Sequence, residues 1–348
     1  EAPGEINATW QNNAVGIFGG TGGSVDVASN FNFAGLGFQA DGYVLNDAGG
    51  SLNTNSTLGS FISVDGGLTA TINATIGGTG QLFKQGAGTL VLGGNNTLSG
   101  DVNLANGTIA VTSDTALGLG SLIVTGGTTL ASGTAPSQGT ITLANNVVLN
   151  GLLNVDLKGT TGDIAPDGTL AADGNNLVLN GTVSGAGGLS VGGFGALVLN
   201  GANTYTGGTL ATFAAIYVGT DSALGTGALT LNNGVLGNAS GATRTLANNI
   251  VLAGDGTVLG PNDLVLNGTI SGAGSLTKQT TSTLTLNGIN SYADGTDLFG
   301  GTIVVGTNSA LGTGQLRVED AGQTTTLRAG IDGLNVGNAV VLGTNANL

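Results

Sequence analysis

The stretch that decides the fold is residues 78–100, which read GTGQLFKQGAGTLVLGGNNTLSG. The same order of leucine, glycine and asparagine positions begins again at Gly185 and once more at Gly272. The second copy lies 107 residues after the first, and the third lies 87 residues after the second. Self-similarity at such intervals indicates a repeat architecture rather than two independent globular domains.

Three further markers keep their order around these copies. They are the Ala-Leu-Gly motif at 116–118, 223–225 and 310–312; the Leu-Val-Leu-Asn-Gly-Thr motif at 177–182 and 264–269; and the Leu-Ala-Asn-Asn motif at 143–149 and 246–252, with a degraded copy at 338–342. The longer first interval has its additional residues near 151–176. A solenoid tolerates one more coil there because each unit contacts only its neighbours. The expected organisation is one solenoid with N-terminal coils at 1–70, repeat 1 with an extra coil at 71–176, repeat 2 at 177–263 and repeat 3 at 264–348.

Short runs such as Leu90–Leu92 and Thr302–Val305 are rich in branched residues and end at Gly, Asn or Asp, which is typical of strands. The Asn-Gly pairs, for example at 106–107, usually indicate hairpins and an antiparallel sheet. Unidirectional repeats and closely spaced strands favour instead an all-β, right-handed parallel β-helix. About 17 coils at ~4.8 Å predict a rod on the order of 80 Å long.

Composition excludes several classes of protein. The 348 residues include 68 Gly, no His, Cys or Met, and a net charge of −14. Disulfides, zinc fingers and Cys/His catalysis therefore need residues that the chain lacks. The negative charge argues against nucleic acid as a partner. The N-terminus carries no targeting signal, so we expect either a cytosolic chain or a mature piece of a secreted one.

Few residues suggest chemistry. A polysaccharide-cleaving β-helix enzyme would need clustered acids, and the nearest cluster is Asp156, Asp163, Asp167 and Asp173. We interpret these as loop aspartates, and Glu319 and Asp320 beside Arg317 as a solvated corner. A structural calcium site would need tandem Gly-Gly-x-Gly-x-Asp, which does not occur. We therefore predict no catalytic, cofactor-binding or metal residues and no cofactor.

Other distinctive residues have structural interpretations. Gly19–Gly23 lacks the Gly-Lys-Ser/Thr of a phosphate loop and is predicted to form a corner. Trp10, the one tryptophan, is expected in the core or at the end of the rod. Tyr205 and Tyr292 are equivalent in two repeats, which favours a structural role. Val191 replaces the lysine found at 84 and 278 in the other copies.

The string of residues 78–100, followed by Tyr-Thr-Gly-Gly at 205–208 and Ala-Leu-Gly-Thr-Gly at 223–227, resembles the passenger-associated transport repeat of autotransporters. The resemblance covers nearly the whole chain. It implies a non-enzymatic, extracellular or cell-surface bacterial passenger that serves as a stalk or adhesin. It also implies an outer-membrane barrel in the full-length precursor, which is not visible in this chain.

Two alternatives stay open. The first is a subunit of an extracellular filament, a homo-oligomer in which β-helix ends stack on one another. The second is the polysaccharide-cleaving enzyme. The sequence does not identify the host or neighbouring-cell surface to which such an adhesin would bind.

Overall fold

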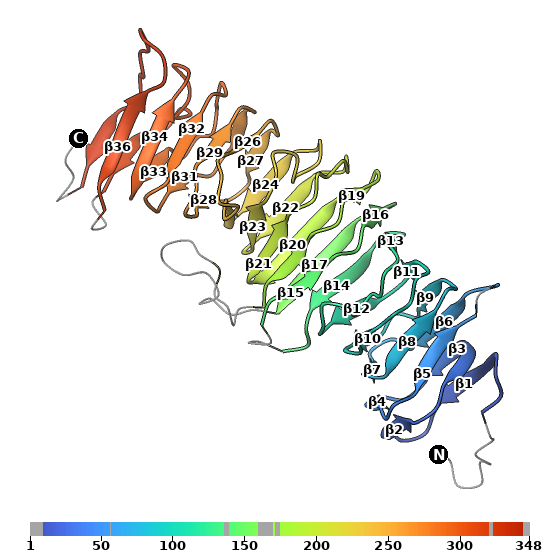
Figure 1. Ribbon diagram of the computed structural model, residues 1–348. Helices are drawn as coiled ribbons and strands as arrows, with labels where there is room; N and C mark the ends of the chain where they lie inside the picture. The colour runs from blue at the N-terminus through green and yellow to red at the C-terminus, as the bar shows by residue number, and fades with distance from the viewer. Residues whose placement is uncertain are drawn as a thin grey trace.

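The computed structural model describes residues 10–55, 57–135, 139–158, 170, 175–319 and 323–343. These residues form a long rod of stacked strands, with β1 near one end and β36 near the other (Figure 1). The rod has about 15 turns, or about 70 Å at ~4.8 Å per turn. It has fewer turns than the 17 predicted because several connections between strands are long.

The strands of the described residues form four sheets. The first sheet contains β1 (Ala14–Phe18), β3 (Phe31–Phe38), β5 (Ser51–Thr54), β6 (Ser60–Val64), β8 (Thr75–Gly78), β9 (Leu82–Gln85), β11 (Val102–Leu104), β13 (Leu122–Val124), β16 (Val147–Leu149) and β19 (Val183–Ser184). The second contains β2 (Ser24–Val27), β4 (Tyr43–Asp47), β7 (Thr69–Ile72), β10 (Thr89–Leu92), β12 (Thr108–Val111), β14 (Thr128–Ser132), β17 (Leu153–Lys158), β20 (Leu189–Phe194), β22 (Thr209–Thr212), β24 (Leu229–Asn232), β27 (Ile250–Leu252) and β30 (Ile270–Gly272).

The other two sheets lie mainly in the C-terminal half. The third contains β15 (Ile141–Leu143), β18 (Leu177–Leu179), β21 (Ala196–Leu199), β23 (Ala215–Val218), β25 (Gly234–Gly237), β28 (Gly256–Leu259), β31 (Leu276–Lys278), β33 (Thr296–Leu298), β35 (Leu316–Val318) and β37 (Val340–Leu342). The fourth contains β26 (Arg244–Leu246), β29 (Leu264–Leu266), β32 (Thr283–Leu286), β34 (Gly301–Val305) and β36 (Thr325–Ala329).

Each strand pairs in parallel with the strand about one turn away, which confirms the parallel β-helix and excludes the antiparallel sheet for the described residues. The Asn-Gly pairs lie at corners between turns rather than in hairpins. At one of them, a Cβ on Gly181 would lie 2.1 Å from the carbonyl oxygen of Asn145 in the preceding turn. A side chain cannot fit there, so the corner requires glycine.

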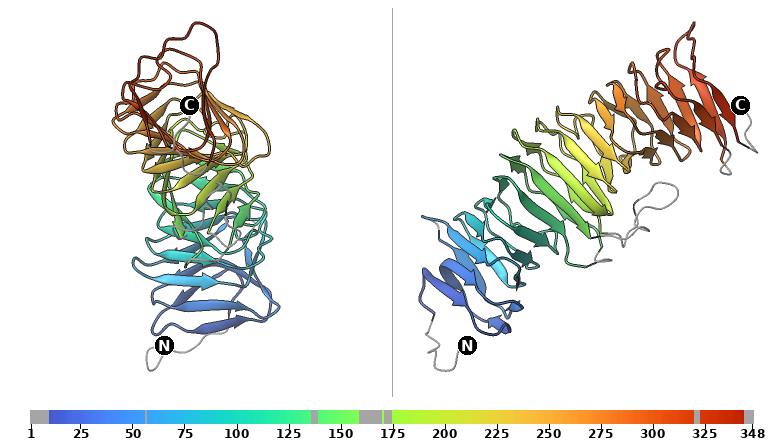
Figure 2. Two further views of the ribbon diagram at one scale, coloured as in Figure 1. Left: turned by 90° about the vertical axis from the view of Figure 1, so that its left-hand side faces the viewer. Right: turned by 180° about the vertical axis from the view of Figure 1, so that it is seen from behind.

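The strands of each sheet follow one another along the rod (Figure 2), and their inward residues stack into ladders. On the second sheet, register places Leu90, Ile109, Leu130 and Val155 above one another, and each is at most 1% exposed. One hydrophobic cluster extends in this way from Val27 to Val318. Over the described residues the main core is therefore continuous along the rod.

Seen along the axis, the turns have three faces. Face I carries the first sheet from β1 to β19 and later the fourth sheet. Face II carries the second sheet. Face III carries β5 and β8 and later the third sheet. Face III lacks strands between β8 and β15, face I lacks strands between β19 and β26, and face II has no strand after β30 in the described residues. Each interruption begins in a different repeat.

The equivalent strands of the three repeats lie on different faces. β9 begins repeat 1 on face I, β20 begins repeat 2 on face II, and β31 begins repeat 3 on face III. Four strand pairings lead from β9 to β19, and four lead from β20 to β30. The strand after β19 is β20, which begins repeat 2, and the strand after β30 is β31, which begins repeat 3. Each repeat therefore spans about four and one third turns, so successive repeats are rotated by one face.

This pairing corrects the extra coil predicted in repeat 1. The intervals of 107 and 87 residues contain the same number of turns. The additional residues lie in the connections that follow β14 and β17, and of these, 136–138, 159–169 and 171–174 lie outside the described residues. The expected repeat boundaries stay predictions.

Candidate functional site: the repeated asparagine clamp

The interruption of each face contains one buried asparagine, which we call the clamp asparagine: Asn96, Asn203 or Asn290. Its Oδ1 accepts a hydrogen bond from the main-chain nitrogen one turn before, and its Nδ2 donates to the carbonyl one turn after. The first distance is 2.7 Å in all three repeats, to Ile76, Val183 and Ile270. The second is 2.6 Å in all three, to Ala116, Ala223 and Ala310.

The clamp works because a carboxamide has the donor and acceptor of a peptide group. Where the strand ladder stops, buried main-chain groups would otherwise lose their partners. The clamp asparagines are only 3–4% exposed, so water cannot replace them. The side chain therefore joins three consecutive turns across a gap in the sheet.

A second asparagine closes each interruption on its far side. The Nδ2 atoms of Asn145, Asn248 and Asn338 donate to the carbonyls of Gly120, Gly227 and Gly314 at 2.6, 2.8 and 2.6 Å. These are the asparagines of the Leu-Ala-Asn-Asn marker or its degraded copy. Their recurrence in the sequence was visible, but their partners, which lie 21–25 residues away along the chain, were not.

Acidic and amide side chains also cap main-chain nitrogens at the corners. Oδ1 of Asp114 accepts from Thr142 N at 2.7 Å, and Oδ1 of Asp221, its counterpart in repeat 2, accepts from Thr245 N at 3.0 Å. In repeat 3 the counterpart is Asn308, which accepts from Asn335 N at 2.9 Å. These carboxylates connect consecutive turns, a role that a neutral amide also fulfils.

Two lysines lie inside the rod. Lys84 and Lys278 are both 0% exposed. Nζ of Lys84 donates to the carbonyls of Gln85 and Gly86 at 2.8 Å and to that of Asn106 at 3.1 Å. Nζ of Lys278 donates likewise to three carbonyls, those of Gln279, Thr280 and Gly300. Desolvation by burial lowers the pKa of each lysine to about 8.

Tyr205 and Tyr292 are fully buried beside the clamp, as their predicted structural role requires. Their hydroxyls share hydrogen bonds with the Oγ1 atoms of Thr209 and Thr296 at 2.5 and 2.6 Å. Repeat 1 has leucine and valine, Leu98 and Val102, at these two positions, and both are 1% exposed. A tyrosine thus occurs where a threonine can satisfy its hydroxyl, and an apolar pair occurs where it cannot.

The aspartate cluster expected near the inserted residues is not assembled in the described structure. Asp156 forms an ion pair with Lys158 two residues along β17. Asp163, Asp167 and Asp173 lie outside the described residues. Arg317 pairs with Asp297 at 3.0 Å and with Glu319 at 3.9 Å, while Asp320 is also outside.

The remaining sequence candidates lie near the N-terminal end. Trp10 packs against the core cluster and meets the Phe31 ring edge-on, with 5.9 Å between ring centroids. Gly19–Gly23 forms a corner between β1 and β2. Within the described ranges, no three or more Asp, Glu, His or Cys side chains gather as they would to bind a metal ion. No helix suited to crossing a membrane occurs in the same ranges.

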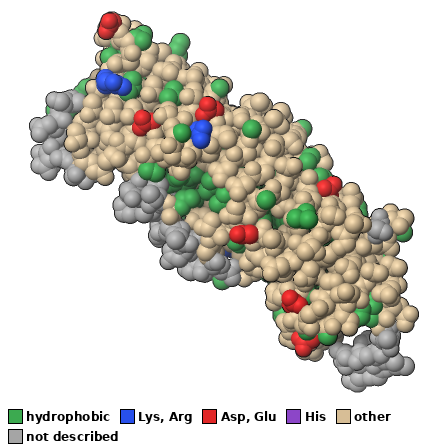
Figure 3. Space-filling view, in the orientation of Figure 1, with side chains coloured by type: hydrophobic (Ala, Val, Ile, Leu, Met, Phe, Trp, Pro, Cys, Tyr) green, Lys and Arg blue, Asp and Glu red, His purple; other side chains and the backbone are tan. Residues whose placement is uncertain are grey.

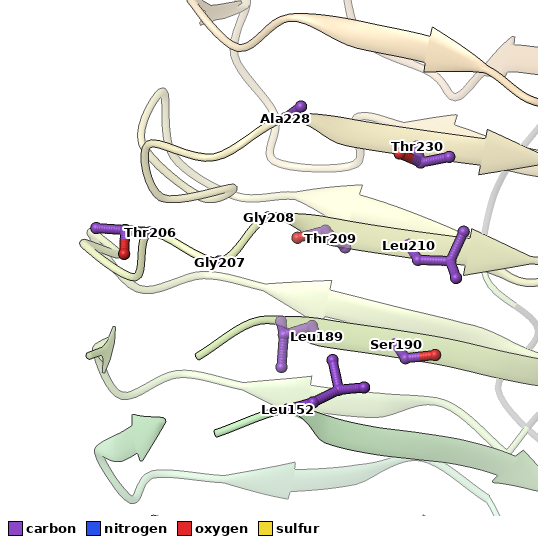
Figure 4. Close-up of a pocket in the computed structure, with 10 residues that line it drawn as sticks. All are labelled: Leu152, Leu189, Ser190, Thr206, Gly207, Gly208, Thr209, Leu210, Ala228 and Thr230. Atoms are coloured by element: carbon purple, nitrogen blue, oxygen red, sulfur yellow. The ribbon is translucent and has the colours of Figure 1, made fainter. Parts of the chain in front are cut away.

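One surface groove opens at the edge of face II, at the level of β20 and β22 (Figure 4). It has a volume of about 320 Å³ and no charged residue in its lining. Leu152 and Leu210, which flank it from different turns, are 47% and 37% exposed. The face seen in Figure 3 has few charged side chains and several exposed apolar ones near its middle.

The chain is similar in sequence to known proteins. The family model for the passenger-associated transport repeat matches residues 82–111, 192–211 and 276–305. Over 121 residues, 32% of the chain, the sequence is 36% identical to the adhesin BmaC autotransporter of Brucella suis biovar 1 (strain 1330). That alignment covers only 4% of the relative. No solved structure matches the chain. The chain is thus a parallel β-solenoid that contains three matches to the passenger-associated transport repeat and is similar to part of an autotransporter adhesin.

Proposed function

We propose that the chain is a non-enzymatic part of a cell-surface autotransporter passenger, which acts as a stiff stalk and carries adhesive surface. The observation that carries this proposal is the continuous main core from Val27 to Val318. A rod with a continuous core and no internal domain boundary resists bending because every turn is hydrogen-bonded to both neighbours. Length and stiffness are the properties that a stalk needs.

The surface location and the adhesive role are supported by the relative, whose name describes an adhesin and an autotransporter. Such a precursor would bring the passenger to the cell surface through an outer-membrane barrel. The groove beside Leu152 and Leu210 offers an uncharged, partly apolar contact area on a chain of net charge −14. Exposed apolar patches on soluble proteins often mark contact sites.

The non-enzymatic role is supported by what the acidic side chains do. Asp114, Asp221 and Asp263 each accept a hydrogen bond from a main-chain nitrogen about one turn later along the chain. Carboxylates used in this way form part of the scaffold. A glycosidase would need two of them facing one cleft at a defined separation.

The stalk is tested by shortening the rod. Excising residues 189–275 joins repeat 1 directly to repeat 3 and removes about four and one third turns, or ~21 Å. Electron microscopy of the purified chain should then show rods shorter by that length and of unchanged width. Rods that bend at fixed points, or an excised chain that does not fold, would contradict a uniform stalk.

Adhesion is tested with beads that carry the chain and are presented to cultured host cells and to the producing bacteria. Replacing Leu152 and Leu210 together by Asp should reduce bead capture, while Thr69→Asp, elsewhere on face II, should not. Equal capture by all three chains would move the adhesive surface away from the groove. Capture no better than that of uncoated beads would reject adhesion by this chain.

End-to-end assembly is a second proposal. In β37, Val340 and Leu342 pair with the inward-facing Leu316 and Val318 of β35, yet they are 49% and 52% exposed. A second copy could cover this end and pair with its strands. Filaments whose length grows with protein concentration would support assembly, and single rods at every concentration would reject it.

A further inference from the structure

One corner of repeat 1 brings an Asn-Gly pair against the buried ammonium of Lys84. Asn106 is exposed, and its Oδ1 accepts a hydrogen bond from the main-chain nitrogen of Gly107 at 2.8 Å. That contact holds the nitrogen beside the side-chain carbonyl carbon of Asn106. The main-chain carbonyl oxygen of the same asparagine accepts a hydrogen bond from Nζ of Lys84 at 3.1 Å.

We propose that Asn106–Gly107 is a site of spontaneous deamidation, and that Lys84 directs its product to isoaspartate. In the first step the Gly107 nitrogen loses its proton to water and attacks the side-chain carbonyl carbon of Asn106. A carbon–nitrogen bond forms, and ammonia leaves with a proton from solvent. The product is a five-membered succinimide, and no oxidant or reductant is involved.

Water then opens the ring at one of two carbonyl carbons. Attack at the main-chain carbon breaks its bond to the Gly107 nitrogen, which stays attached through the former side chain, and this product is isoaspartate. Negative charge develops during that attack on the oxygen that Lys84 already contacts. A donor fixed at such an oxygen stabilises the transition state because it needs no reorganisation.

Lys84 is fixed by its other contacts, the carbonyls of Gln85 and Gly86 at 2.8 Å. The new carboxylate is formed from the main-chain carbonyl, next to the ammonium. A hydrogen bond from the ammonium to an uncharged carbonyl thereby becomes an ion pair.

Neither other repeat has this combination. The counterparts of Asn106 are Phe213 and Gly300, neither of which can deamidate. The Asn-Gly pair at 287–288 is held differently: Nδ2 of Asn287 donates to Oδ1 of Asn267 at 2.8 Å, in an exposed contact between turns. Asn287–Gly288 is therefore a matched control within the same chain.

The test is peptide mapping by mass spectrometry, with fragmentation that distinguishes isoaspartate from aspartate, after storage of the folded chain at neutral pH. The Asn106 peptide should deamidate faster than the Asn287 peptide. The ratio of isoaspartate to aspartate at Asn106 should exceed that of the urea-unfolded chain by about tenfold, as about 1.4 kcal/mol of transition-state stabilisation gives. In Lys84→Met, circular dichroism should show a retained fold, and the ratio should return to the unfolded value.

Two results would overturn the proposal. Deamidation at Asn106 no faster than at Asn287 would remove the site. Equal product ratios in the folded and the urea-unfolded chain would remove the role of Lys84, and this comparison needs no variant to fold.

Discussion

Repeats 1 and 2 fill one equivalent inward position with opposite chemistries. Lys84 stacks between Ile62 and Leu104 on face I, whereas Val191 stacks between Val155 and Ala211 on face II. Both residues are at most 1% exposed. The lysine places its aliphatic stem in the ladder and its ammonium against the carbonyls of the corner. The ladder thus accepts a charge wherever the next corner supplies acceptors.

The corners differ because the strands end differently. β9 stops at Gln85, so the following carbonyls turn toward Lys84. β20 continues to Phe194 and pairs with β17 as far as Lys158, which keeps its main chain in the sheet. A side chain and the local backbone path are therefore matched within each repeat, even though the fold is shared.

The strongest test of this matching is Val191→Lys. An ammonium at this buried site should lack a ring of carbonyl acceptors, and an uncompensated buried charge costs about 4 kcal/mol. We expect a marked fall in the midpoint of chemical unfolding, measured by circular dichroism. Val191→Met serves as the size control and should cost about 1–3 kcal/mol, because it adds volume to a packed site. A Lys variant as stable as the Met variant would show that any corner can accept a lysine.

The clamp is tested with Asn203→Ala. The change leaves Val183 N and Ala223 O buried without their partners, which should lower the free energy of unfolding by about 3 kcal/mol. The control is Asn200→Ala, which removes an exposed side-chain contact to Asn180 and should cost less than about 0.5 kcal/mol. Similar losses in the two variants would mean that water replaces the clamp.

The apolar pair of repeat 1 can be transferred to repeat 2. Tyr205→Leu alone should leave the Thr209 hydroxyl without its hydrogen-bond partner and leave a gap in the core. Thr209→Val alone should leave the Tyr205 hydroxyl without its partner. The double variant copies Leu98 and Val102, so its loss should be smaller than the sum of the single losses by about 1 kcal/mol. Chemical unfolding of the wild-type chain, the two single variants and the double variant measures this coupling. Strictly additive losses would show that the two residues are not energetically coupled.

The smallest expected effect is on pH dependence. In the folded chain, burial lowers the pKa of Lys84 and Lys278 from the usual lysine value of 10.5 to about 8. Between these values the unfolded chain binds more protons, so the free energy of unfolding should rise as pH increases from 8 to 10. Above pH 10 the free energy of unfolding should fall again. Burial raises the pKa of Tyr205 to about 12, so the folded chain binds more protons than the unfolded chain in this range.

Replacing both lysines by Met should flatten the rise between pH 8 and 10 in guanidinium titrations. Arg328→Met, which changes an exposed cation, is the control and should preserve the rise. A rise of equal steepness in both variants would assign the pH dependence to other groups.

The sequence by itself determined the repeat, the parallel strands and the inward aliphatic ladders, because these depend on periodicity and on residues such as Leu90–Leu92. It also indicated the structural roles of Tyr205, Tyr292 and Trp10. It overestimated the number of turns and converted a longer connection into an extra coil, because a count of residues does not distinguish a turn from a loop.

Only the tertiary structure decided on which face of the rod each repeat begins and which hydrogen bonds its polar residues form. A repeat of about four and one third turns rotates each copy by one face relative to the copy before it. The additional third of a turn depends on where the chain bends at each corner. The partners of Asn96 and Lys84 lie about one turn away, at Ile76, Ala116 and Asn106. Hydrogen bonds between turns require the register of the stack, which local pattern does not contain.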